Sequence, residues 1–306
     1  MLTLGWSDGN SFLPLSQCLL SSAERENRLQ EASSDIDELS NGGKLRKLVQ
    51  TKATSVMLTL LKDVKAADIP AKYVLFDTWF CSPSSLLQVK NIGYDSIGMV
   101  KKSDKIHFRY NGRMQSTPAI FRAAKKRRGR SSSLLSVEAE AIKGNQAIPV
   151  KLVFVRNRNN RQDYLILVST DVNLSEEEII QTYGKRWNIE VFFKMCKSYL
   201  KLGKESRTMS YDAMTAHVAV VLARYMLLSL EQRRKIDKRS IGELFYVSCD
   251  ELQDLQFKDA LVMVLKKLVS MITEKWLFLE NELNAMLDSF LENLPNVWHK
   301  CLNRCA

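Results

Sequence analysis

The chain has 306 residues, of which 45% are hydrophobic and 26% are charged, and it carries 45 Lys and Arg against 34 Asp and Glu. This composition argues against an intrinsically disordered chain. The net charge of +11 suggests a polyanionic partner, most simply nucleic acid, and a membrane surface or a generally basic protein is the alternative. Six dispersed cysteines without a CxxC pair and the absence of a signal-peptide pattern indicate reduced thiols in a cytosol. The most apolar stretch, residues 217–230, is interrupted by Arg224 and is too short to predict a membrane span.

The first part of the chain predicts a hairpin followed by a helix. Residues 1–22 contain two apolar runs around the turn sequence Ser-Asp-Gly-Asn at 7–10, which is typical of a β-hairpin. Residues 24–43 lack sustained apolar spacing and predict a loop. Apolar residues recur at helical spacing over 44–67, so this segment is expected to be one helix.

A strand, a helix and a second strand are expected next. The short apolar run 73–77 ends in Asp77 and is typical of a buried strand. Residues 82–91 predict a helix with a proline in the first turn, and residues 96–100 predict another strand. This order favours a parallel α/β core.

The pattern then changes to closely spaced strands. Residues 105–115 carry Asn111-Gly112 between alternating residues, a hairpin signal, and three further strands are expected at 134–142, 148–156 and 164–170. We therefore predict a β-rich insertion over 102–173. It also holds a basic run at 122–130, which is ordinarily a solvated loop.

The rest of the chain has helical patterns. Ser175 and Glu178 fit a capping box, and the helix that they begin is expected to continue to about residue 200. We predict four parts of the chain: a first part of the core at 1–101, the β-rich insertion at 102–173, a second part of the core at 174–235, and a helical C-terminal region at 236–306.

The predicted helix at 175–200 separates its polar and apolar residues. Projected at about 100° per residue, one stripe holds a single carboxylate among cations and aromatic rings: Tyr183, Arg186, Trp187, Glu190, Lys194 and Lys197. The opposite side holds Ile189, Val191, Phe192, Met195 and Cys196. The stripe alone is also compatible with a solvated face that carries i,i+4 ion pairs.

Asp77 and Glu190 together suggest a metal-dependent nuclease. A carboxylate after a buried strand and one on a later helix can converge to hold two Mg²⁺ ions, which activate water and stabilise the leaving oxygen of a phosphodiester. The cations on the same helix face would then hold DNA phosphates. The alternative for Asp77 is a plain turn residue after a strand.

The run from Tyr183 to Lys197 resembles the signature of a known family. Its spacing matches the Y-x2-R-x3-E-x6-K signature of the IS-four group of insertion-sequence transposases, on Tyr183, Arg186, Glu190 and Lys197. The segments LTLGWSDGNSFLPL, YVLFDTWFCSP and KSYLKLGKESRTMSYDAMTAHVAVVLARYMLL are also similar to that group. The resemblance covers essentially the whole chain. It implies an α/β fold with a ribonuclease H-like core, interrupted by a β-rich insertion and followed by an α-helical C-terminal region.

The resemblance also implies an activity and its residues. The expected activity is cut-and-paste DNA transposition with Mg²⁺, for which Mn²⁺ substitutes, on double-stranded DNA at the transposon ends and on target DNA. Asp77 and Glu190 would be the second and third acids of a DDE triad and metal ligands. Tyr183, Arg186 and Lys197 would bind phosphates, Trp187 would pack or contact DNA, and further DNA contacts are expected from Lys194, Lys125, Lys126, Arg127 and Arg128.

The first acid of the triad has no evident position. In the family it lies on a strand before the hairpin, and this chain starts within the hairpin, so we expect it to lack an N-terminal part and to have impaired activity. Asp8 is an alternative first acid, although Asp is common in such turns for backbone reasons. A further alternative is a catalytically dead remnant that only binds DNA. Location in the cytoplasm on DNA is expected, and the C-terminal helices either form a homodimer in the DNA complex or pack on the core.

Overall fold

The computed structural model describes residues 1–28, 35, 37–127, 131–157, 160, 162–204 and 210–234, together with residue 265. The chain divides into one unit at Met1–Ile241 and a second at Gly242–Ala306. The helical C-terminal region predicted over 236–306 therefore lies outside the described residues, apart from the single residue 265. The proposed part boundaries at 101/102 and 173/174 remain predictions.

The amino-terminal segment is the expected hairpin. Strand β1 (Leu2–Ser7) pairs antiparallel with β2 (Phe12–Cys18), with a register shift at Leu4 and Gly5. Asp8 shapes the turn, because its Oδ1 accepts hydrogen bonds from the backbone N–H groups of Asn10 and Ser11, and its Oδ2 pairs with Arg233 at 2.6 Å. Both carboxylate oxygens of Asp8 thus have structural partners, which disfavours Asp8 as a catalytic acid.

Two helices replace the single helix expected over 44–67. After a short 3₁₀ turn, η1 (Arg25–Asn27), helix α1 (Asn41–Leu48) is capped by Ser40, and α2 (Ala53–Ala66) follows it. The break has a tertiary cause. The carbonyl of Val49 accepts the N–H of Ser21 at 2.9 Å, so a distant segment takes an acceptor that a continuous helix would have used.

A strand, a helix and a strand follow as predicted. Strand β3 (Tyr73–Phe76) pairs parallel with β4 (Asp95–Val100), and α3 (Pro83–Ile92) connects them. Ser82 caps α3 by accepting the N–H of Ser85, and Gly93 ends it with a φ of 98°, a conformation that favours glycine. This confirms the α/β class.

The β-rich segment extends the same sheet. Its elements are β5 (His107–Tyr110), β6 (Arg113–Ser116), α4 (Thr117–Ala123), β7 (Ser133–Lys143), β8 (Gln146–Arg156) and β9 (Tyr164–Ser169). The seven-stranded sheet has the order β3-β4-β9-β8-β7-β5-β6, whereas β1 and β2 form a separate two-stranded sheet. Asn111 and Gly112, with φ of 51° and 75°, form the predicted tight turn between β5 and β6.

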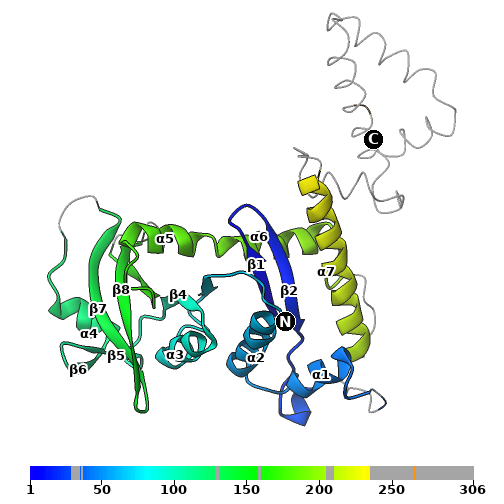
Figure 1. The fold of residues 1–306 in the computed structure, drawn as a ribbon, viewed down its shortest axis with the longest axis horizontal. Helices are drawn as coiled ribbons and strands as arrows, with labels where there is room; N and C mark the ends of the chain where they lie inside the picture. The colour runs from blue at the N-terminus through cyan, green and yellow to red at the C-terminus, as the bar shows by residue number, and fades with distance from the viewer. Residues whose placement is uncertain are drawn as a thin grey trace, which may run out of the picture. The chain divides into compact units, whose positions relative to one another are not determined.

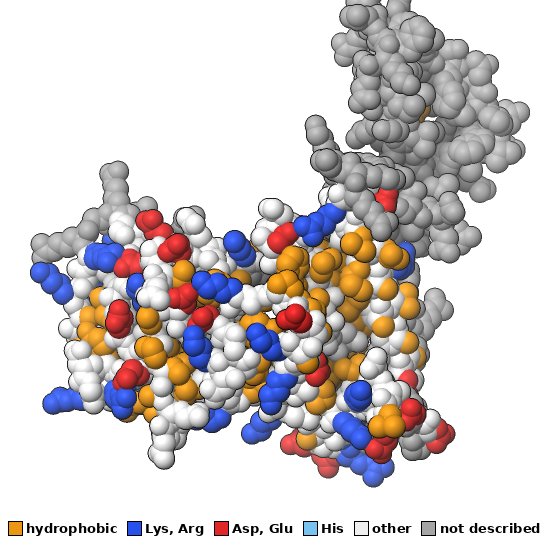
Figure 2. Space-filling model, in the orientation of Figure 1, with side chains coloured by type: hydrophobic (Ala, Val, Ile, Leu, Met, Phe, Trp, Pro, Cys, Tyr) orange, Lys and Arg blue, Asp and Glu red, His pale blue; other side chains and the backbone are white. Residues whose placement is uncertain are grey.

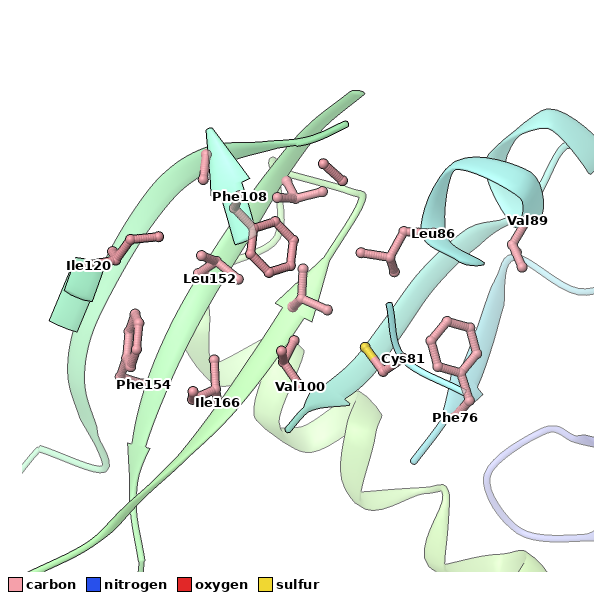
Figure 3. Close-up of a cluster of buried hydrophobic side chains, with 14 of the residues drawn as sticks. Phe76, Cys81, Leu86, Val89, Val100, Phe108, Ile120, Leu152, Phe154 and Ile166 are labelled. Carbon is pink, nitrogen blue, oxygen red and sulfur yellow. The ribbon is translucent and has the colours of Figure 1, made fainter. Parts of the chain in front are cut away.

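Helices cover both faces of the seven-stranded sheet. Leu152 and Phe154 on β8 point into a cluster shared with Leu86 of α3 and Leu61 of α2, and Figure 3 shows much of this cluster. Val153 lies between them in sequence and points into a second cluster with Ile179 of α5 (Glu176–Gly184). Because side chains alternate along a strand, α2 and α3 lie on one face and α5 on the other.

Helices α5 and α6 (Trp187–Ser198) run one after the other from the seven-stranded sheet to the hairpin (Figure 1). The hairpin packs on α2 through Cys18, Val56 and Leu60, and on α6 through the rings of Phe12 and Phe192, whose centroids are 5.0 Å apart. The middle layer thus consists of two separate sheets that are bridged by helices.

Helix α7 (Tyr211–Arg234) ends the described part. By length and composition alone, its residues Tyr211–Arg233 could cross a membrane, which differs from the expectation from the sequence. Val221, Leu222 and Tyr225 are buried, whereas Val220, Leu227 and Leu230 are exposed. Hydrophobic side chains accordingly gather over α7 and the hairpin in Figure 2.

Candidate nucleic-acid and metal site

Asp77 is exposed at the end of β3, where the chain turns towards α3. Its Oδ1 accepts the N–H of Trp79 at 2.9 Å, and its carbonyl accepts the N–H of Cys81 at 3.1 Å. Asp77 therefore stabilises the turn that follows β3, as the alternative interpretation of Asp77 as a turn residue predicts.

The helix that carries the signature is interrupted at Lys185 and Arg186. The predicted capping box is present, since Ser175 Oγ accepts the N–H of Glu178 and Glu178 Oε2 accepts the N–H of Ser175. At the junction, the N–H groups of Lys185 and Arg186 bond three residues back rather than four. This tight 3₁₀ geometry separates α5 from α6, so the prediction of one helix over 175–200 was wrong.

The junction brings Tyr183, Arg186 and Glu190 together. The Arg186 guanidinium lies 5.8 Å from the centroid of the Tyr183 ring, and its Nη1 pairs with Glu190 Oε1 at 3.2 Å. The Tyr183 hydroxyl and Arg186 Nε are buried and have no hydrogen-bond partner within the described part of the chain. Such orphaned donors suit an oxygen-rich ligand, because an unpaired buried donor costs free energy.

Asp77 acts electrostatically on the same group. Burial raises the pKa of the Tyr183 hydroxyl, the charge of Arg186 opposes this rise, and the charge of Asp77 adds to it. Burial, followed by the Asp77 charge, also raises the pKa of the Cys81 thiol. We call Asp77, Tyr183, Arg186 and Glu190 the signature cluster.

The remaining predicted residues of α6 lie on its outer surface. Trp187 is 64% exposed, and Lys194 and Lys197 are also exposed. Lys197 also lines an apolar cavity of about 550 Å³ with Met214 and His217. The structure therefore places Lys197 beside α7, further along α6 than the signature cluster.

The basic run after α4 is only partly available to a ligand. Lys125 and Lys126 are exposed, and Lys126 Nζ lies 4.8 Å from the centre of the Phe121 ring. Arg127 instead forms a bidentate ion pair with Glu176 on α5. Its Nη1 and Nη2 donate to the two carboxylate oxygens of Glu176 at 2.5 and 2.7 Å. Arg127 thus has a structural role, and Arg128 lies outside the described residues. On the face in Figure 2, basic side chains are interspersed with acidic ones.

The ion pair between Arg127 and Glu176 makes the free energy of unfolding depend on pH. Burial acts to raise the pKa of Glu176, but hydrogen bonds from Ser133 and Arg127 outweigh it and hold that pKa below the ordinary 4.5. A lowered pKa in the folded state means that this stabilisation is complete above about pH 4.5 and is lost as the pH falls below it.

We therefore expect Glu176→Gln to lower the free energy of unfolding by about 1–3 kcal/mol at pH 7. The variant and the parent should converge progressively as the pH falls below 4.5, as measured by urea unfolding at pH 7 and at a series of acidic pH values. Glu177→Gln is the matched control, since Glu177 lies in the same first turn of α5 and is exposed. Equal losses in the two variants would contradict the assigned role of Glu176.

Trp79 is a residue that the sequence interpretation missed. Its side chain is 77% exposed, and its backbone N–H is held by Asp77. An exposed indole beside a candidate catalytic acid is suited to stacking on a base. The signal in the sequence was the large aromatic residue two positions after Asp77.

The carboxylates of the signature cluster supply hard oxygen donors of the kind that Mg²⁺ prefers. Among the described residues, however, no three His, Cys, Asp or Glu side chains are grouped to hold a metal ion. Glu190 is also paired with Arg186. The Asp77 and Glu190 carboxylates are of the right chemical type for a divalent ion, and their joint role in one ion site remains a prediction.

The class of the protein is given by the comparison with known families. Residues 50–227 match the family model described as Transposase DDE domain, and the chain belongs to that family. No curated protein matches the chain. The mixed α/β architecture is consistent with a ribonuclease H-like transposase fold, and family membership implies DNA binding and, typically, the use of divalent ions.

Proposed function

We propose that this chain is an insertion-sequence transposase of the IS-four group, with cut-and-paste chemistry directed by Asp77 and Glu190. The observation that carries the proposal is the signature cluster, in which Arg186 contacts both Tyr183 and Glu190 and Asp77 acts on the Tyr183 hydroxyl. The substrates would be double-stranded DNA at the element ends and target DNA, in the cytoplasm.

In this proposal each residue has a defined task. Asp77 and Glu190 would hold Mg²⁺ or Mn²⁺, and a bound pair of such ions would supply an activated water and charge stabilisation at the leaving oxygen. Tyr183 and Arg186 would position the phosphate through the Tyr183 hydroxyl and Arg186 Nε, which lack a hydrogen-bond partner among the described residues. Arg186 and Glu190 pair with each other at 3.2 Å, so a phosphate bound by Arg186 would compete with the Glu190 carboxylate for the guanidinium.

Other contacts would fix the DNA along its backbone. Lys194 and Lys197 are exposed on α6, and Lys125 and Lys126 are exposed after α4. These cations would supply affinity without sequence preference, and this affinity falls steeply with salt. Trp187 and Trp79 would contact bases or sugars beside the cleavage position. A homodimer that engages both element ends also belongs to the proposal.

A second function is favoured by one specific observation. The described residues bring only two carboxylates to the signature cluster, and no group of three metal-binding side chains is present among them. With two acids, the ions are held weakly and cleavage is impaired. The second candidate is therefore a protein that binds element ends without cutting them.

Glu190→Gln separates the two candidates. Labelled duplexes that carry the element ends flanking the gene are incubated with the full chain, and anisotropy reports binding while a gel reports Mg²⁺-dependent nicking. We expect slow nicking by the parent, background nicking by Glu190→Gln and undiminished binding by both, since the substitution removes a negative charge near phosphate.

Glu177→Gln is the charge-matched control and should nick like the parent. Specific binding with no nicking by the parent would favour the second function. Nicking that survives Glu190→Gln, or binding that does not distinguish element ends from shuffled DNA, would refute the proposed role of the site.

A further inference from the structure

Gly98 is a buried glycine inside β4, the strand next to β3 in the seven-stranded sheet. It pairs with Phe76 of β3 on one side and with Val168 of β9 on the other. Its φ is not positive, so the backbone conformation at this position does not require glycine. A glycine inside a strand then indicates that another part of the chain approaches the sheet closely at this point.

The space beside Gly98 is filled by two side chains from the segment around Asp77. A Cβ atom at residue 98 would lie 2.8 Å from Cys81 Sγ and 2.8 Å from the nearest carbon of the Phe76 ring, which is closer than such atoms can pack. Both side chains are buried in one cluster, and Figure 3 shows them next to each other. The missing side chain of Gly98 therefore leaves a notch in the sheet, and the Cys81 thiol occupies this notch.

The Cys81 thiol holds one end of the turn that contains Asp77. Residues 77–82 connect β3 to α3, and the N–H of Cys81 donates to the Asp77 carbonyl at 3.1 Å across this turn. Within the turn, the N–H of Trp79 donates to Asp77 Oδ1 at 2.9 Å. Ser82, the N-cap of α3, follows Cys81 directly. A displacement of Cys81 would therefore move the turn and the carboxylate that the turn orients.

We infer that Gly98 is a positioning residue for the Asp77 carboxylate, and that it acts through the Cys81 thiol in its notch. A side chain at residue 98 would push Cys81 or the Phe76 ring away from the sheet, because close-packed interiors have little free space to absorb an added group. The consequence for catalysis rests on the proposed function of Asp77. The consequence for the geometry of the turn does not, and it has its own measurement.

The geometry is tested with Gly98→Ala in the full chain labelled with ¹⁵N-tryptophan. Solvent exchange of the Trp79 amide reports its hydrogen bond to Asp77, and Asp77→Ala gives the exchange rate without this acceptor. We expect Gly98→Ala to speed the exchange of Trp79 by roughly three- to tenfold, which is the loss of one hydrogen bond. The amides of Trp6 on β1 and Trp187 on α6 should keep their rates.

The consequence for catalysis is read from Mg²⁺-dependent nicking of element-end DNA. Gly98→Ala should lower the nicking rate by roughly ten- to a hundredfold, as a small displacement of a reacting group does. DNA binding should stay at the parent level, because Gly98 is buried and offers no contact to DNA. If the parent does not nick, the proposed function fails, and the exchange of Trp79 still decides the role of Gly98.

Cys81→Ala is the compensating change, because the loss of Sγ makes room for a methyl group at residue 98. The double variant should exchange at Trp79 more slowly than Gly98→Ala and should nick faster. Cys81→Ala alone empties the notch and should also speed the exchange of Trp79, which keeps the test valid if Gly98→Ala does not fold.

Gly42→Ala is the matched control. Gly42 lies on α1 without a positive φ, and its Cβ would lie 3.8 Å from Ser40 Oγ, an ordinary contact distance, so this variant should behave like the parent. Unchanged exchange of Trp79 in both Gly98→Ala and Cys81→Ala would overturn the inference. Equal changes at all three tryptophan amides, or a double variant no closer to the parent than Gly98→Ala, would overturn it as well.

Discussion

Phe192→Ala is expected to lower the free energy of unfolding by about 3–5 kcal/mol, which is the cost of a large cavity in a packed core. The Phe192 side chain is fully buried on α6. Its ring lies 5.0 Å from Phe12 of β2, 5.0 Å from Phe193 and 4.8 Å from Tyr225 of α7, measured between centroids. One side chain therefore joins the signature helix to the hairpin and to the last described helix.

Urea unfolding measures this loss, and Val191→Ala is its control. Val191 is the preceding residue on the same helix and is 46% exposed, so its truncation should change stability by no more than about 0.5 kcal/mol. Similar losses for the two variants would mean that α6 is not anchored through Phe192. The account of how Glu190 is positioned would then fail.

Arg186→Ala is expected to weaken DNA binding by roughly ten- to a hundredfold, the loss that follows removal of a charge-assisted hydrogen-bond donor. Arg186 is the residue that links Tyr183 to Glu190, and its Nε is a buried donor without a partner in the described part of the chain. The slope of log affinity against log salt should also fall by about 0.9, the value for one lost phosphate contact.

Two variants separate charge from geometry at this position. Arg186→Lys keeps the charge and should restore the salt slope, but it should recover only part of the affinity, since lysine lacks the planar fork. Lys143→Ala removes an equal charge at the end of β7, four strands from β3 in the sheet, and should leave specific affinity nearly unchanged. If Arg186→Ala bound element ends like the parent, a phosphate role for Arg186 would be excluded.

The elements that the sequence predicted well are those set by local chemistry. The Asn111-Gly112 turn, the capping box at Ser175 and the turn at Asp8 depend on residues within a few positions of one another. Strand β3 was likewise evident from a short apolar run. The signature spacing also identified Tyr183, Arg186 and Glu190, which the structure brings together.

The errors arose where distant segments decide the outcome. The break between α1 and α2 depends on Ser21, and the role of Arg127 depends on Glu176, 49 positions away. Val191 was expected on the buried face of the signature helix but is half exposed, because it lies at the edge of the apolar arc. Periodicity does not report such contacts.

The central claim is that Asp77 and Glu190 share one divalent-ion site. Indole N–H signals of the ¹⁵N-tryptophan-labelled chain test it directly, because Trp79 follows Asp77 and Trp187 precedes Glu190, and both are exposed. In the presence of element-end DNA, Mn²⁺ should broaden the Trp79 and Trp187 signals at the same Mn²⁺ concentration. Asp77→Asn and Glu190→Gln should each prevent the broadening of both signals. Broadening of only one signal, or broadening that either substitution leaves unchanged, would contradict a shared site.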